Sequence, residues 1–201
     1  MELSGEGSRL LKQVEFIAEI DKLKNVYRQS FLMDASRHED DAEHSWHIAM
    51  MAVVLREYAN DKGVDLLKAI KMLLVHDIVE IDAGDVLVYN KEFEGGIVTR
   101  EKKAADRIFN ILPADQALEL RSLWEEYEER KTAEARFAMA MDRLQPILQN
   151  YFTQGRSWKA HGITAGQVLH VNARIRDGSE ELWELARDIV RESVEKGYLM
   201  P

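Results

Sequence analysis

The stretch LLKAIKMLLVHDIVEIDAGD, residues 66–85, is the part of the chain that decides the fold. Its apolar side chains recur every three or four positions, which is the spacing of one face of a helix. The apolar positions are Leu66, Ile70, Leu73 and Leu74. We therefore predict a helix that begins near Asp65 and ends near Ile81. His76 and Asp77 follow four apolar residues in this helix, so both polar side chains should point into the core.

The same helical spacing extends over most of the chain. Helices are predicted over residues 9–26, 42–58, 65–81, 99–112, 113–127 and 132–151, followed by two that begin at Thr164 and Ser179. Asp41 is expected to cap the second of them, and residues 29–41 and 82–96 are expected to be loops. Only 3 prolines and 11 glycines are present, which leaves little turn chemistry for a β fold. We predict an all-α single domain over residues 1–201, a helical bundle of about eight helices.

Composition excludes several classes of protein. The net charge of −9 argues against binding to nucleic-acid polymers or to an anionic membrane, because both need a basic surface. The longest apolar run, Ile48 to Leu55, is too short to span a bilayer. No cysteine is present, which excludes disulfides, thiolate zinc sites and iron–sulfur clusters. The first residues lack the pattern of a signal peptide, so we expect a cytoplasmic protein.

His76-Asp77 is joined by two further candidate metal ligands. His44 lies at the start of a predicted helix, where a side chain can meet the end of a neighbouring helix. Asp142 is the only acidic residue of the apolar segment FAMAMDRL, residues 137–144, and a buried carboxylate is costly unless it is paired. A metal ion is one good partner. Ordinary capping of a helix end by the His-Asp pair, and a salt bridge from Asp142 to Arg143, are the alternative interpretations.

The order His44, His76-Asp77, Asp142 resembles the signature of the HD-domain metal-dependent phosphohydrolases. The closer resemblance is to the branch that includes the bacterial 5′-deoxynucleotidases and the HD domain-containing protein 2 group. It covers residues 23–151 and leaves 152–201 as C-terminal helices that pack on this core. The matching segments are LKNVYR (23–28), EHS (43–45), HDIVEIDAGD (76–85), RE (100–101), LWEEY (123–127) and AMDRL (140–144).

The resemblance implies that His44, His76, Asp77 and Asp142 hold one divalent metal ion. Two imidazoles and two carboxylates form a neutral site with such an ion, and this mixed set suits Mn, Co, Fe, Ni, Mg or Zn. The ion would lower the pKa of a bound water and withdraw charge from a phosphoryl oxygen.

Two more acidic residues match catalytic positions of the family. Glu80 follows His76 by four residues and Asp77 by three, and therefore lies on the same helical face as these ligands. Asp85 follows Gly84, which lets the chain turn back toward the metal. The resemblance implies that Glu80 is the general acid or base and that Asp85 positions the water or the leaving group; the two roles could be reversed. A solvated acid at a helix end is the alternative for each.

Arg28 matches the arginine with which the family contacts the substrate phosphate, a role that suits its planar guanidinium. A surface arginine is the alternative. The chain departs from the family at the next position: relatives that prefer deoxyribose carry a tryptophan there, and this chain has Gln29. We therefore expect weaker discrimination between deoxyribose and ribose.

The leading hypothesis is a phosphohydrolase that converts nucleoside 5′-monophosphates to nucleoside and phosphate, in a homodimer as the resemblance implies. A second possibility is an HD phosphohydrolase for another phosphoester, such as an alarmone-like nucleotide. A third is a non-catalytic helical protein that binds a metal or a nucleotide. The chain has no histidine between Ile78 and Met141, which argues against the binuclear HD phosphodiesterases.

Overall fold

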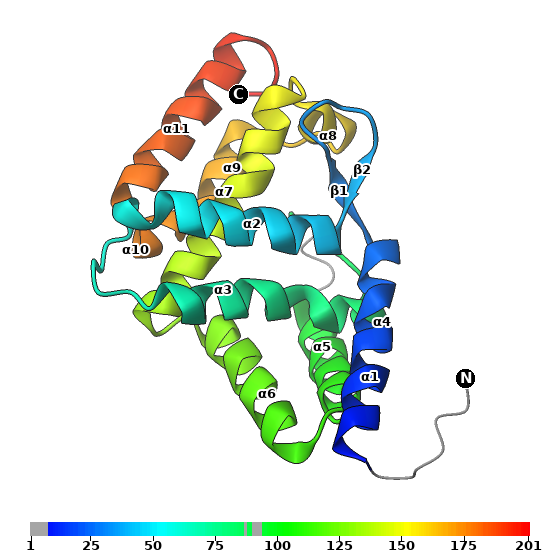
Figure 1. The fold of residues 1–201 in the computed structure, drawn as a ribbon. Helices are drawn as coiled ribbons and strands as arrows, with labels where there is room; N and C mark the ends of the chain where they lie inside the picture. Colours follow the sequence, from blue (N-terminus) through cyan, green and yellow to red (C-terminus); the bar gives the residue numbers. More distant parts are fainter. Residues whose placement is uncertain (1–7, 87, 90–93) are drawn as a thin grey trace.

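Helices account for most of the computed structural model, which describes residues 8–86, 88–89 and 94–201 (Figure 1). Over these residues eight helices have eight or more residues, so the prediction of an all-α bundle of about eight helices is confirmed. They are α1 (Arg9–Ile20), α2 (Asp41–Leu55), α3 (Leu66–Val75), α5 (Glu94–Phe109), α6 (Ala114–Glu129), α7 (Ala133–Phe152), α9 (Ala165–Asn172) and α11 (Glu180–Glu195). Three helices are shorter: α4 (Glu80–Ala83), α8 (Arg156–Ala160) and α10 (Ile175–Gly178). None of the described helices is long and apolar enough to cross a membrane.

The prediction of a loop over residues 29–41 holds only for residues 32–37 and is wrong for the rest. Strand β1 (Tyr27–Phe31) pairs antiparallel with β2 (His38–Asp40), in a register that places Tyr27 opposite Asp40 and Phe31 opposite His38. Strands of five and three residues are too short to produce a clear alternation of apolar and polar residues. The hairpin packs against α7 and α8, where the Arg156 guanidinium lies 4.0 Å from the centre of the Phe31 ring.

The start of α2 is set by a reciprocal pair of hydrogen bonds. The Asp40 carboxylate accepts from the backbone N–H of Glu43, and the Glu43 carboxylate accepts from the backbone N–H of Asp40. This capping box makes Asp40 the capping residue, so the prediction that Asp41 caps the helix is wrong. Asp41 instead occupies the first helical position and is completely buried.

The helix predicted to end near Ile81 ends six residues earlier, at Val75. The chain continues as the 3₁₀ helix η3 (His76–Val79) and the short α4, and then turns at Gly84, which has a φ of +75°. A 3₁₀ segment is more tightly wound than an α-helix, so His76 and Asp77 leave the line of α3. Helix α5 starts at Glu94 and not at Thr99 as predicted. Asn90, which belongs to the predicted 82–96 loop, lies outside the described residues.

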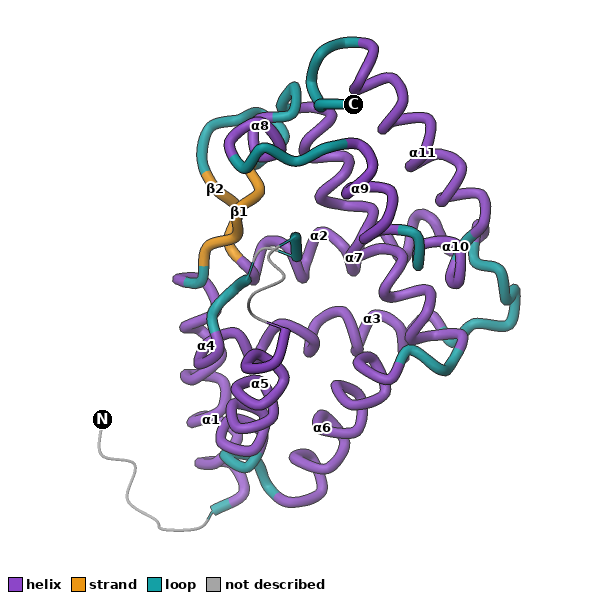
Figure 2. Tube along the Cα trace, turned by 180° about the vertical axis from the view of Figure 1, so that it is seen from behind, coloured by secondary structure: helices purple, strands orange, loops and turns teal. Residues whose placement is uncertain are grey.

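Helix α7 is the centre of the main hydrophobic core (Figures 1 and 2). It packs against α2, α3, α6, α10 and α11, and its apolar residues from Ala135 to Ile147 are all buried. A second core lies between α1, α5, α6 and η3, with Phe16, Ile108 and Trp124 among its members. The His76–Val79 segment therefore connects the two cores, which restrains it on both sides.

Gly178 offers a test of how closely α10 approaches α7. A Cβ at this position would lie 2.2 Å from the Arg136 carbonyl oxygen, a backbone atom that cannot move aside. We expect Gly178→Ala to lower the free energy of unfolding by about 1–3 kcal/mol, the usual cost of overpacking. Urea denaturation measures this, with Gly166→Ala in α9 as the control, since its Cβ would have an ordinary contact. Equal stability of the two variants would contradict the close approach.

Candidate metal centre

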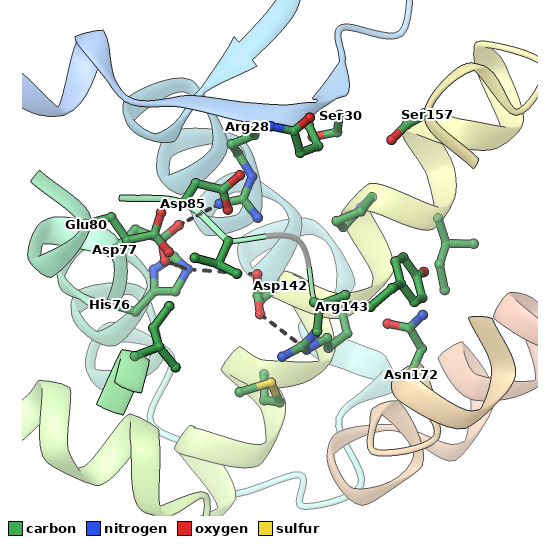
Figure 3. Close-up of a pocket in the computed structure, with 18 of the residues that line it drawn as sticks. Arg28, Ser30, His76, Asp77, Glu80, Asp85, Asp142, Arg143, Ser157 and Asn172 are labelled. Carbon is green, nitrogen blue, oxygen red and sulfur yellow. Dashed lines mark hydrogen bonds and ion pairs between the residues drawn. The ribbon is translucent and has the colours of Figure 1, made fainter. Parts of the chain in front are cut away.

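Three elements bring the four predicted metal ligands to one place. His44 comes from the first turn of α2, His76 and Asp77 come from η3, and Asp142 comes from the middle of α7. Figure 3 shows His76, Asp77 and Asp142 pointing toward one another at the wall of a cavity. His44 is completely buried, and the other three side chains are at most 13% exposed.

Both imidazoles face the same two carboxylates. His44 Nε2 lies 3.1 Å from Asp142 Oδ1 and 3.8 Å from Asp77 Oδ2. His76 Nε2 lies 3.0 Å from Asp77 Oδ1 and 3.8 Å from Asp142 Oδ1. The ligand atoms of His44, His76 and Asp77 are all within 4.8 Å of one another, an arrangement that could hold a metal ion.

The chemistry of His76 supports a cation at this position. Its Nδ1 lies 2.9 Å from the Leu73 carbonyl oxygen, which can only accept, so Nδ1 carries a proton. Its Nε2 is buried and makes no hydrogen bond, although it faces two carboxylates. A lone pair on Nε2 would be repelled by those oxygens unless a cation lies between them. The four side chains therefore fit a divalent ion with mixed nitrogen and oxygen ligands.

Without a metal, a proton on His76 supplies the positive charge. Burial opposes that charge, but Asp77 and Asp142 outweigh the effect and raise the pKa of His76 to about 10. Burial also opposes ionisation of Asp77, yet the neighbouring His76 lowers the pKa of this carboxyl to about 2. For His44, burial and the charge of Arg28 lower the pKa to about 4. Of the two imidazoles, His76 is therefore the one whose protonation the surrounding carboxylates favour.

Arg28 reaches the same cluster from β1. Its guanidinium donates to Asp77 Oδ2 at 2.8 Å and to Asp41 Oδ1 at 3.1 Å, and its Nε lies 4.0 Å from Glu39 Oε2. The Arg28 side chain is only 14% exposed, which contradicts the alternative of a surface arginine. A guanidinium at this position could also donate to a phosphate in the cavity.

Glu80 and Asp85 line the cavity next to Asp77 and Arg28 (Figure 3). Glu80 Oε2 is buried and has no hydrogen-bond partner. Burial, together with the negative charges of Asp77 and Asp41, raises the pKa of Glu80 well above its usual value. Burial also raises the pKa of Asp85, while Arg28 opposes that rise. Neither acid is a solvated residue at a helix end.

The cavity continues beyond the charged residues. Its volume is about 440 Å³, within the range of small-molecule sites. His76, Asp77 and Asp142 of the metal cluster line one end together with Arg28 and the two acids (Figure 3). Gln29 also lines the cavity. The other end combines apolar and amide side chains from α7, α8, α9 and nearby loops: Tyr89, Ile147, Trp158, Ile163 and Asn172. The cavity thus has a charged end suited to a phosphate and a less polar end suited to a ring system.

Four residues of the site did not emerge from the sequence. Buried Glu39 and Asp41 lie beside Arg28, Gln145 bonds to His44, and the Tyr127 hydroxyl donates to Asp142 Oδ2 at 3.0 Å. The only local signal was Asp40 followed three residues later by Glu43, which is the pattern of a capping box. This pattern predicts Asp40, and not Asp41, as the residue that caps the helix. The others depend on partners far away in the chain.

Comparisons with known proteins identify the family of this chain. The sequence pattern of the HD domain matches residues 20–183, farther toward the C-terminus than the predicted 23–151. The chain is 33% identical to 5′-deoxynucleotidase HDDC2 of Homo sapiens over 174 residues, which cover 83% of this chain and 82% of the relative. It is 34% identical to the Dictyostelium discoideum protein of the same name over 143 residues, 69% of this chain and 75% of the relative. Among solved structures, a predicted metal-dependent phosphohydrolase from Magnetospirillum magnetotacticum superposes with a TM-score of 0.92 at 53% identity, covering 96% of this chain and 97% of its own.

Removing one ligand should empty the metal site. We expect His76→Ala and Asp142→Ala to bind no Mn²⁺ after purification and to melt at a lower temperature, because other buried polar groups lose their partners. Asp142→Ala, for example, leaves the Tyr127 hydroxyl with only the weakly accepting Met139 sulfur at 3.9 Å. Metal analysis and thermal unfolding measure both effects, with His170→Ala on the exposed side of α9 as the control. Full metal occupancy in either variant would remove that residue from the site.

Proposed function

Because the chain belongs to the HD domain family and is a metal-dependent phosphohydrolase, we propose that it hydrolyses nucleoside 5′-monophosphates to nucleoside and phosphate. Both deoxyribonucleotides and ribonucleotides are included in this proposal. The relatives at 33% and 34% identity carry the name 5′-deoxynucleotidase, which supports this substrate class.

The observation that carries the proposal is the arrangement along the cavity. Three of the four ligands, His76, Asp77 and Asp142, share one end with Arg28 and Glu80. An apolar and amide-lined space with Trp158 and Asn172 forms the other end. A 5′-monophosphate has matching parts, with a dianionic phosphate at one end and a flat base at the other. The site would place the scissile bond at the charged end.

Each residue near the phosphate would have a separate task. A divalent ion held by the four ligands would lower the pKa of a bound water and withdraw charge from a phosphoryl oxygen. Arg28 would donate to the phosphate oxygens and hold them in position. Glu80, with a free oxygen at the cavity wall, would take or give the proton, and Asp85 would orient the water or the departing 5′ oxygen.

The presence of Glu80 and Asp85 at this cavity argues against a non-catalytic metal-binding protein. Such a protein would need the ligands but not two further half-buried acids with raised pKa values. Hydrolysis of an alarmone-like nucleotide is the remaining alternative.

Phosphate release tests the proposal directly. Deoxyribo- and ribonucleoside 5′-monophosphates with each base, and a guanosine tetraphosphate, would be supplied with Mn²⁺, with Co²⁺ or with a chelator. We expect metal-dependent release from the 5′-monophosphates, and weaker preference for dAMP over AMP in the wild type than in Gln29→Trp. Turnover of the tetraphosphate alone would favour the alternative. Rejection of ribonucleotides by several orders of magnitude in the wild type would contradict the role inferred for Gln29.

Glu80→Ala separates catalysis from metal binding. We expect turnover to fall by roughly 10²-fold or more, the usual contribution of a positioned acid or base, while the metal content stays unchanged. The matched control is Asp82→Ala, also in α4, because Asp82 is exposed and pairs with Arg107 outside the cavity. Loss of metal in parallel with activity would instead identify Glu80 as a ligand or a structural support.

Arg28→Ala should weaken substrate binding. Losing a charge-assisted hydrogen bond of about 1.5–3 kcal/mol corresponds to a KM increase of roughly 10- to 100-fold. A contact that strengthens in the transition state would lower kcat as well. Arg28→Lys is the comparison, since it keeps the charge beside Asp41 and Asp77 but not the planar donor pair. Unchanged kcat and KM in Arg28→Ala would exclude Arg28 from the substrate site.

We also propose that the protein forms a homodimer. Several large apolar side chains on α2 and α3 are more than 40% exposed: Trp46, Met50, Val53, Val54, Leu67 and Leu74. Exposed apolar groups in this number are typical of contact surfaces. Light scattering would give the mass in solution, and Val53→Glu should shift a dimer to monomers; a wild-type mass of one chain contradicts the proposal.

A further inference from the structure

A buried hydrogen-bond chain connects His44 to the hairpin. His44 Nδ1 lies 3.2 Å from Gln145 Oε1, and Gln145 Nε2 donates to Glu39 Oε1 at 2.6 Å. All three side chains are at most 2% exposed. None of the steps assigned above to the metal ligands, Arg28, Glu80 or Asp85 uses Gln145 or Glu39.

We propose that Glu39 and Gln145 are positioning residues that hold His44 in the tautomer with its proton on Nδ1, leaving Nε2 free to bind the metal ion. The proposal rests on the role of His44 as a ligand. It gives a function to Glu39 and Gln145, neither of which is a metal ligand itself.

The comparison with His76 shows why two residues are needed. At His76 the partner of Nδ1 is the Leu73 carbonyl oxygen, which can only accept a hydrogen bond. At His44 the partner is an amide, and an amide turned by 180° would present its NH₂ group in place of its oxygen. With the NH₂ group toward Nδ1, His44 would carry its proton on Nε2 and could not bind a metal through that atom.

Glu39 removes this ambiguity. An ionised carboxylate only accepts hydrogen bonds, so the Gln145 group that faces it at 2.6 Å must be the NH₂ group. His47 Nδ1 lies 3.3 Å from the same nitrogen and can accept its second hydrogen. The amide oxygen is left facing His44, which must then donate from Nδ1. Outer residues of this kind set ligand orientation in many metal sites.

Gln149 provides a matched control. It lies one turn beyond Gln145 on α7 and is also buried, at 1% exposed. Among the described residues its side chain forms no hydrogen bond to His44, whose Nδ1 faces Gln145 instead. Replacing either glutamine by methionine removes a buried amide of similar size. Only the change at position 145 removes the acceptor for His44.

The experiment measures Mn²⁺ affinity from the free-ion signal in electron paramagnetic resonance. We expect Gln145→Met to weaken Mn²⁺ binding by roughly 10- to 100-fold, the usual effect of losing an outer-shell partner, and Gln149→Met to change it by less than about 3-fold. Glu39→Gln should fall between the two, because its amide oxygen can still accept from Gln145 while its NH₂ group permits the reversed orientation. Equal affinities for the two methionine variants would overturn the proposal.

A second readout reports the tautomer itself. In the ¹⁵N-histidine protein saturated with Zn²⁺, nuclear magnetic resonance should show His44 with a proton on Nδ1 and the metal on Nε2. A proton on Nε2 would overturn the proposal. His44→Ala separates the role of His44 as a ligand from the role of Glu39 and Gln145 in positioning it. If His44→Ala keeps full Mn²⁺ affinity, the ligand set is wrong; if it loses affinity while Gln145→Met keeps it, only the role of the Glu39–Gln145 pair is wrong.

Discussion

The burial of several charges in one space is the constraint on which the structure depends. His44, His76, Asp77, Asp142 and Arg28 meet where α2, η3, α7 and β1 converge. Charged groups inside a protein are costly unless each has a partner, so no element of this group can move independently. The apolar surroundings of α7 and the second core behind η3 keep these partners at contact distance. The fold can be understood as the support of this cluster.

The two-stranded hairpin contributes more than its size suggests. It places Arg28 against Asp77, and it buries Glu39 next to Gln145 on α7. Its last residue, Asp40, also caps α2, which sets the position of His44 four residues later. A short segment of the chain therefore positions Arg28 and Glu39 directly, and His44 through the start of α2. Small displacements of this hairpin should affect metal binding and substrate binding together.

The cavity extends from this charged cluster to a surface lined by apolar and amide side chains. Helices α8 and α9, which follow the central helix, contribute Trp158 and Asn172 to the end away from the metal ligands. The HD domain match to residue 183 includes these helices. Helix α7 contributes to both ends of the cavity, through Asp142 and Ile147, whereas α8 and α9 contribute to the end away from the metal ligands. Gln29, which follows Arg28 in β1, also lines this cavity.

The amino-acid sequence by itself determined the helices and most of their caps. These features depend on local spacing: apolar residues every three or four positions, and Thr132, Thr164 and Ser179 before helices. The candidate metal ligands followed from the resemblance to the HD family, with the isolated Asp142 among apolar neighbours as the supporting local pattern. Only the tertiary structure decided the hairpin, the 3₁₀ turn at His76 and the burial of Glu39 and Asp41. The reason is physical: the bond from Gln145 to Glu39 joins residues 106 positions apart, and their burial results from packing between elements that no local pattern records.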